Sequence, residues 1–283
     1  MVDPGLRYIE HLTERDLEVL LEATDPAEAS RLLQDDPGLI DRLLSSQDVF
    51  DRVYRSDGVS PFLVFGLLVH RAAAELDRMD YVPEWVAPRR RLPVFNVAPL
   101  RDLLADRSRR LFLAELLASF TRVASDSYLV RTRRGMRRRR FSELDPFHLI
   151  EIAEAAPAAT RPGVHRRLGD VALFLTGCLP DHTGSRRFTF PEMERLAGAV
   201  SLDAGSLLAL VAGVEEPGRS LALLEIAGAR WYRMAHQAAY EMSGAGPPQL
   251  AVVADRFHEA RRVLNYLADR HLYPFEQDWL LPA

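Results

Sequence analysis

Several short apolar segments near the start of the chain begin with a proline that follows an aspartate or a serine. These pairs are Asp25-Pro26, Asp36-Pro37 and Ser60-Pro61. Each pair combines a side chain that caps a helix with a residue favoured in the first turn, and Thr13 with Asp16 forms a similar capping signal. Because helices joined by breaks of about two to six residues pack as antiparallel neighbours, this pattern predicts an all-α fold.

The rest of the chain continues the helical pattern, with one interruption rich in proline and arginine. Apolar residues at helical spacing resume after residue 97, and two strong helices are expected at about 220–242 and 249–271. We therefore predict a bundle of roughly ten to twelve helices in two packed subdomains. The predicted division is an acidic N-terminal helical subdomain over 1–88, a Pro/Arg-rich connector over 89–97 and a main helical subdomain over 98–283.

The predicted core is formed by apolar stripes on the longest helices. One face of an amphipathic helix leaves water when helices pack, and this burial is the main favourable contribution to folding. The residues that we expect to be largely buried are Leu63, Phe65, Leu68, Leu113, Leu117, Phe120, Leu173, Phe174, Leu224, Phe257 and Leu264.

The segment from 126 to 142 has β character. Strand-favouring residues at 128–130 precede Arg134-Gly135, which suits a two-residue turn because glycine accepts a positive φ. We therefore predict an arginine-rich β-hairpin over about 127–142, inserted in the main subdomain. The register that follows from this turn pairs Arg131 with Arg138 and Tyr128 with Phe141.

Every basic residue is an arginine, and the charges are unevenly distributed. The chain has 36 arginines, no lysine and 40 acidic residues. Residues 1–88 carry 8 arginines and 18 acids (net −10), 89–140 carry 15 and 4 (+11), and 141–283 carry 13 and 18 (−5). A lysine-free chain is typical of a GC-rich coding sequence, or of selection against a side chain that is readily acylated. The charge asymmetry indicates a polyanionic partner, or two segments of the chain that face each other.

The arginine cluster at 131–140 is the strongest candidate binding site. Like charges that face each other across a hairpin are destabilising, so phosphates or carboxylates must offset them unless the arginines form a solvated face. The planar guanidinium matches phosphate oxygens, and an aromatic side chain can stack on a base. The candidate polyanion-binding residues are Arg131, Arg133, Arg134, Arg137, Arg138, Arg139, Arg140, Arg89, Arg90 and Arg91, with Tyr128 and Phe141 as stacking candidates.

The last two predicted helices offer an alternative site. Tyr232, His236 and Tyr240 are spaced i, i+4, i+8 and therefore share one helix face. If this face meets the final helix, the two would form a cleft with acid–base groups and aromatic walls. The simpler interpretation is a helix–helix interface with solvated charges. The candidate cleft residues are Trp231, Tyr232, His236, Tyr240, Asp255, His258, Glu259 and Arg262.

Common catalytic and cofactor motifs are missing from the sequence. It contains no HExxH, Walker, GxGxxG or GxSxG motif, so we expect no metal and no cofactor. The single cysteine, Cys178, lies in an apolar run and excludes internal disulfides and cysteine metal clusters. No apolar stretch approaches the roughly 20 residues of a membrane span, and the N-terminus lacks a secretory pattern. We therefore expect a cytoplasmic protein with no membrane partner.

These observations favour a binding protein over an enzyme. The leading interpretation is a non-catalytic interaction or regulatory protein whose arginine-rich hairpin binds an acidic protein surface or nucleic acid. The alternative is a small-molecule enzyme or ligand-binding protein that uses the cleft between the two C-terminal helices.

Overall fold

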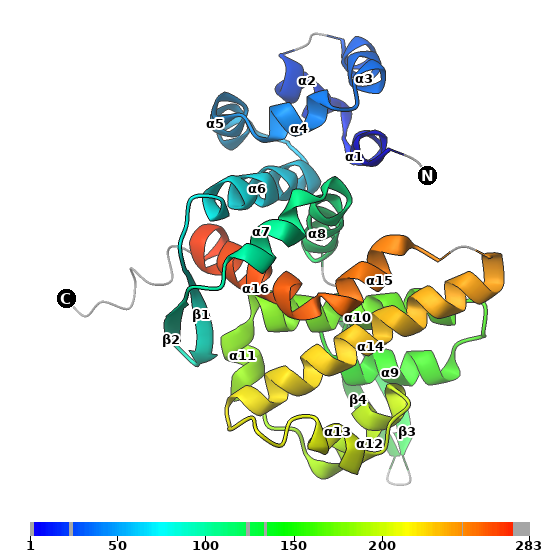
Figure 1. The fold of residues 1–283 in the computed structure, drawn as a ribbon. Helices are drawn as coiled ribbons and strands as arrows, with labels where there is room; N and C mark the ends of the chain where they lie inside the picture. The colour runs from blue at the N-terminus through cyan, green and yellow to red at the C-terminus, as the bar shows by residue number, and fades with distance from the viewer. Residues whose placement is uncertain (1–2, 23–24, 123–124, 133–134, 245, 274–283) are drawn as a thin grey trace. The chain divides into compact units, whose positions relative to one another are not determined.

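The computed structural model describes residues 3–22, 25–122, 125–132, 135–244 and 246–273, with the backbone alone between 125 and 141. These residues form sixteen α-helices, a π-helical turn and two β-hairpins, which confirms the predicted all-α class (Figure 1). The helices outnumber the roughly ten to twelve expected from periodicity, partly because a predicted long helix is divided. Each helix in the described part of the chain is too short or too polar to cross a membrane.

The described residues form two compact units. Of the described residues, unit 1 comprises those up to Val82, Val94–Thr121 and 270–273. Unit 2 comprises Pro83–Pro93 and Arg122–Asp269, so each unit is built from separate stretches of the chain. The helices of unit 1 are α1 (Pro4–His11), α2 (Glu14–Leu21), α3 (Pro26–Asp35), α4 (Leu39–Leu44), α5 (Gln47–Arg55), α6 (Pro61–Leu76), α7 (Ala98–Ala105) and α8 (Arg107–Ser119).

Several helices of unit 1 begin at predicted capping residues, whereas α4, which follows the predicted signal at Asp36-Pro37, begins after Gly38 without a side-chain cap. Thr13 and Asp16 form the predicted capping box at α2, and the side chains of Asp25 and Ser60 accept hydrogen bonds from the first turns of α3 and α6. These caps satisfy backbone N–H groups that have no partner within the helix. The apolar faces then meet in a core that includes Tyr8, Leu20, Leu33, Ile40, Leu63 and Leu111.

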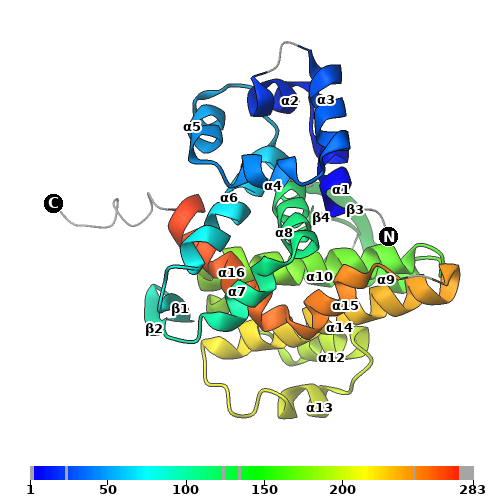
Figure 2. The same cartoon turned by 45° about the horizontal axis from the view of Figure 1, so that its top comes forward.

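Unit 2 is built around two long helices that run side by side, α10 and α14 (Figure 2). Shorter helices surround this pair, and two hairpins lie almost wholly within the unit. The elements are β1 (Val82–Ala87), β2 (Arg90–Val94), β3 (Ser125–Thr132), β4 (Gly135–Ser142), α9 (Pro146–Ala155), α10 (Arg161–Cys178), α11 (Pro180–Ser185), α12 (Phe190–Ala199), α13 (Ala204–Ala209), α14 (Gly218–Ser243), α15 (Pro248–Asp255) and α16 (Phe257–Leu267), followed by the π-helical turn η1 (Ala268–Leu272).

Glycines allow α10 to approach α14 and α16 closely. A Cβ atom placed on Gly169 would lie 2.5 Å from the ring of Tyr232 on α14. A Cβ atom on Gly177 would lie 2.6 Å from the Cβ of Leu264 on α16. Both distances are far below van der Waals contact, so any larger residue would force the helices apart.

Two parts of unit 2 differ from the division expected from the sequence. The predicted helix over 249–271 is broken at Arg256, between α15 and α16. The predicted connector over 89–97 contributes strand β2, which pairs with β1. Trp85 of β1 is buried, and its indole N–H donates to Asp181, so the hairpin is tied to α11 rather than forming an unpaired connector.

The second hairpin, β3–β4, forms where it was predicted, but the expected register is wrong by two residues. Thr132 pairs with Gly135, and Arg131 pairs with Met136 instead of Arg138. A shift of two leaves every residue on the same face of the hairpin, so alternation along the strands cannot distinguish the two registers.

The predicted core is largely confirmed. Of the eleven residues named, all are buried except Phe65 and Phe174, which are partly exposed. Both belong to helices, α6 and α10, that carry apolar residues on more than one face. Periodicity alone does not show which of these faces is fully covered.

We expect Gly177→Ala to destabilise the protein and Gly163→Ala, on the same helix, to leave it unchanged or more stable. A Cβ on Gly163 has no atom within 4 Å, so it gains helix propensity of up to about 1 kcal/mol without a clash. A Cβ on Gly177 must displace Leu264, at a cost of about 1–3 kcal/mol. Denaturant unfolding of the two variants measures the difference, and equal stabilities would contradict the close packing of α10 on α16.

Candidate functional site

The β3–β4 hairpin carries more positive charge than its flanking acids neutralise. Residues 125–145 contain seven arginines and three acidic residues, a net charge of +4. Two of those acids are engaged outside the hairpin: Glu143 pairs with Arg167 at 2.6 Å, and Asp145 caps α9 and lies 4.0 Å from Arg186. The net charge of +4 already counts all three of these acids, so the acidic residues of this segment are too few to match its arginines.

The candidate binding residues on the hairpin are described only by their backbone, and Arg133 and Arg134 lie outside the described residues. In the observed register Arg138 pairs with Leu129, and Tyr128 pairs with Arg139 rather than with Phe141. The expected pairing of Arg131 with Arg138 is wrong. These two arginines do not face each other across the hairpin, so the repulsion expected between them does not arise. The residues in question are Arg131, Arg137, Arg138, Arg139, Arg140, Tyr128 and Phe141.

The second arginine group, at 89–91, is divided between two roles. Arg91 contacts Asp269 at 2.7 Å and Asp181 at 3.3 Å. Burial opposes its charged form, but the two carboxylates outweigh that effect and raise the pKa of Arg91. Arg89 has a φ of 58° between β1 and β2 and is exposed, as is Arg90. Arg91 therefore serves the packing of unit 2, and the other two face solvent.

A pocket of about 270 Å³ lies at the base of the arginine-rich hairpin. Its floor is apolar, and its polar groups include Asp145, His182 and Arg186. Ser142, the last residue of β4, is part of its wall. We call this the Arg186 pocket; it is lined by Ser142, Leu144, Asp145, Pro146, Leu175, Leu179, His182, Thr183, Arg186, Phe188 and Leu224.

Aromatic rings and a carboxylate hold Arg186 in place. Its guanidinium carbon lies 5.2 Å from the ring centre of Phe147 and 5.4 Å from that of Phe188. The two rings meet edge to face, and Arg186 also donates to Glu192 at 2.9 Å. Burial disfavours the charged form of Glu192, but the N–H of Thr189 and the guanidinium outweigh it and lower its pKa. The pocket therefore presents an oriented cation.

The aromatic part of the alternative cleft is mostly buried. Trp231 and Tyr232 are both 0% exposed, with the indole donating to the Ala199 carbonyl at 3.1 Å and the phenol to Asp170 at 2.8 Å. Burial and the neighbouring Asp170 carboxylate raise the pKa of Tyr232. These two residues belong to the helix packing of unit 2 rather than to the wall of an open cleft.

The remaining cleft candidates are engaged in separate local contacts. His236 lies 3.1 Å from the Pro247 carbonyl, and Tyr240 is 55% exposed. Glu259, on α16, is partly exposed. The ion pairs formed by the others are Asp255 with Arg233, His258 with Glu225, and Arg262 with Glu84. The residues that share this face of α14 therefore lie at different depths, from the core to solvent. The candidate cleft residues do not meet at one point.

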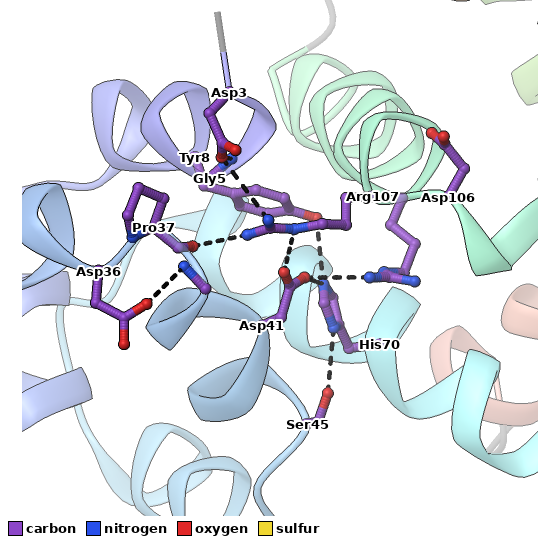
Figure 3. Close-up of polar contacts among 12 residues, drawn as sticks. Asp3, Gly5, Tyr8, Asp36, Pro37, Asp41, Ser45, His70, Asp106 and Arg107 are labelled. Atoms are coloured by element: carbon purple, nitrogen blue, oxygen red, sulfur yellow. Dashed lines mark hydrogen bonds and ion pairs between the residues drawn. The ribbon is translucent and has the colours of Figure 1, made fainter.

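Unit 1 contains a polar cluster, partly buried around His70, that links four helices (Figure 3). Asp41 of α4 is bound by Arg107 and, at 3.1 Å, by Arg110, both from α8. Arg107 also donates to the Pro37 carbonyl at 2.7 Å. His70 of α6 lies 3.6 Å from Asp41. The cluster pairs the carboxylate of one helix with two guanidinium groups of another, and all three side chains are partly exposed.

In space, His70 lies between Ser45 and Asp41, an arrangement that resembles the nucleophile, base and acid of a catalytic triad. His70 lies 3.4 Å from the Ser45 hydroxyl and 3.4 Å from the Tyr8 hydroxyl. The imidazole is only 3% exposed, and burial together with Arg110 and Arg107 lowers its pKa to about 3. A base so weak cannot hold a proton near neutral pH, which general acid–base catalysis requires. We therefore interpret the cluster as structural.

Metal ligands and a reactive thiol are not indicated by the described residues. Within them, no group of three or more His, Cys, Asp or Glu side chains is arranged to hold a metal ion. Cys178 is buried, and burial raises its pKa, so the thiol stays protonated. His182, which follows closely in sequence, lines the Arg186 pocket instead.

The Arg186 pocket is not predictable from the sequence. Its residues come from α9, α10, α11, α14 and the loops beside them, and no motif or periodicity relates them. The only local signal is the segment Arg186–Phe188, in which two arginines precede an aromatic residue. The Asp41 cluster was also missed because its members are spread over more than 100 residues, from Tyr8 to Arg110.

No protein-family model matches the chain, and comparisons with curated proteins and with solved structures found no match. The candidate site must therefore be judged on its geometry and charge.

We expect the stability of the protein to fall as the pH decreases below 6.5, partly because of His70. The unfolded chain binds a proton near pH 6.5, whereas the folded protein binds it only near pH 3. Between these values the group contributes a slope of up to about 1.4 kcal/mol per pH unit. The variant His70→Gln cannot titrate, so its unfolding free energy should depend less steeply on pH between 6.5 and 5. An identical slope in both proteins would contradict this assignment.

Proposed function

We propose that this protein binds nucleic acid through the arginine-rich β3–β4 hairpin, in a non-catalytic role. The observation that carries the proposal is the net charge of +4 over residues 125–145, on an isolated two-stranded ribbon. Nucleic acid offers closely spaced phosphates to such a ribbon, and release of its counterions favours binding.

The dimensions of the hairpin suit this partner. Each strand has eight residues, which corresponds to about 27 Å of extended chain. A two-stranded β-ribbon fits the major groove of a duplex, which is about 12 Å wide. Arginine also binds phosphate through two parallel hydrogen bonds, a geometry that lysine cannot match.

The contacts expected from this composition are with the backbone of the nucleic acid. Phosphate contacts set position and affinity but carry no sequence information. We therefore expect binding with little sequence preference and with strong dependence on salt. An acidic protein surface would engage the same arginines, and the experiment below separates the two partners.

We expect the quadruple variant Arg137, Arg138, Arg139 and Arg140→Gln to lose most of its affinity for nucleic acid. Glutamine keeps much of the length and polarity of the side chain but removes the charge. The slope of log K against log salt should become shallower by up to about 3.6, which corresponds to four phosphate contacts. Fluorescence anisotropy with a labelled duplex, measured at several salt concentrations, provides both quantities.

A matched control removes four charges elsewhere. Arg31, Arg55, Arg78 and Arg187 are exposed, and their change to Gln lowers the net charge by the same amount. We expect this control to keep most of the affinity and most of the slope. Equal binding by the hairpin variant and the parent protein would contradict the proposal. Absence of any nucleic-acid binding by the parent protein, combined with retention of an acidic polypeptide, would assign the hairpin to a protein partner.

A further inference from the structure

We infer that the Arg186 pocket binds one nucleotide of a single strand that the hairpin holds; this inference rests on the proposed nucleic-acid binding. The pocket and the hairpin are continuous, because Ser142 ends β4 and also lines the pocket. A strand that follows the hairpin toward its base therefore meets the pocket.

The floor of the pocket suits a planar base. It is formed by leucines from three parts of unit 2, namely Leu144, Leu175 with Leu179, and Leu224, with the ring of Phe188 beside them. A volume of about 270 Å³ is close to the lower end of the range for small-ligand sites, roughly 300–1,000 Å³. The pocket therefore accommodates a single base better than a larger ligand, and an aromatic wall offers it stacking.

The polar groups of the pocket match the rest of a nucleotide. Arg186 is oriented by Phe147, Phe188 and Glu192, and its hydrogen bond to Glu192 uses one of the five N–H donors of a guanidinium. The other donors suit a phosphate group, which arginine binds through a pair of hydrogen bonds. The carboxylate of Asp145, which lines the same pocket, already accepts from the Phe147 N–H and lies 4.0 Å from Arg186, and its remaining lone pairs can accept an N–H from a base.

The pocket, unlike the hairpin, favours single strands. In a duplex the bases are stacked and paired, so entry of one base into a pocket requires unpairing, which costs a few kcal/mol. In a single strand the bases are accessible to aromatic and arginine side chains. The hairpin thus supplies affinity for the backbone, and the pocket adds a contribution that depends on the presence of a base.

The inference is tested by comparing a labelled single-stranded oligonucleotide with a strand of the same length made of abasic sites. Both present the same phosphates to the hairpin, and only the first presents bases. We expect the parent protein to bind the base-bearing strand about tenfold more tightly, as the stacking of one base provides. Phe188→Ala removes the aromatic wall and Leu179→Trp fills the pocket, so both should bring the ratio close to one.

Two matched controls keep the result specific to the pocket. Phe190 is 59% exposed and is not part of the lining, so Phe190→Ala should keep the tenfold ratio. Arg186→Gln removes a phosphate contact and should weaken the binding of both strands, whereas Arg187→Gln, at the adjacent exposed position, should change neither the affinity nor the ratio appreciably. Thermal melting of each variant shows whether it is folded.

The outcomes separate this inference from the proposed function. A parent protein that binds both strands equally, or folded Phe188→Ala and Leu179→Trp variants that keep the tenfold ratio, would overturn the pocket while leaving the hairpin as a nucleic-acid site. If the hairpin quadruple variant binds both strands as well as the parent does, the hairpin proposal fails. Absence of binding to either strand, with the labelled duplex still bound, would overturn the pocket alone, and absence of binding to all three nucleic acids would overturn both.

Discussion

The close approach of α10 to α14 and α16 is the constraint on which unit 2 depends. Gly169 and Gly177 leave no room for a side chain at the two crossings. Asn265 of α16 reinforces the second crossing, because its amide donates to the Thr176 carbonyl at 3.1 Å in a fully buried site. The Arg186 pocket is lined by residues of α10, α11 and α14, so its shape follows from this packing. A pocket assembled on packed helices needs little reorganisation when a ligand enters.

Most of the helices could be predicted from the sequence, because their signals are local. A cap such as Thr13 and a proline in the first turn act within a few residues. The break at Arg256 carries neither glycine nor proline and could not be seen locally. The register of β3–β4 was missed for a different reason. A shift of two preserves the alternation of faces, and the choice depends on which residues enter the turn.

The candidate site was only partly visible in the sequence. The arginine cluster is contiguous, so its charge is evident without a structure. The Arg186 pocket is assembled from residues between Ser142 and Leu224, and only tertiary packing brings them together. The helical stripe of Tyr232, His236 and Tyr240 illustrates the opposite error. A shared face suggested a common site, yet Tyr232 is fully buried and Tyr240 is largely exposed. Periodicity shows which side of a helix a residue faces, but it does not show how deeply that residue is buried.

Because unit 1 is built from distant stretches of the chain, it cannot be completed early while the chain is being synthesised from its N-terminus. His271, from the last described segment, lies 3.1 Å from Glu75 of α6. Although α1 to α6 leave the ribosome first, this contact can form only after nearly the whole of unit 2 has been translated. The unit that begins the chain is therefore completed last. Unit 2, apart from its first hairpin, is a nearly continuous segment that can fold as it emerges.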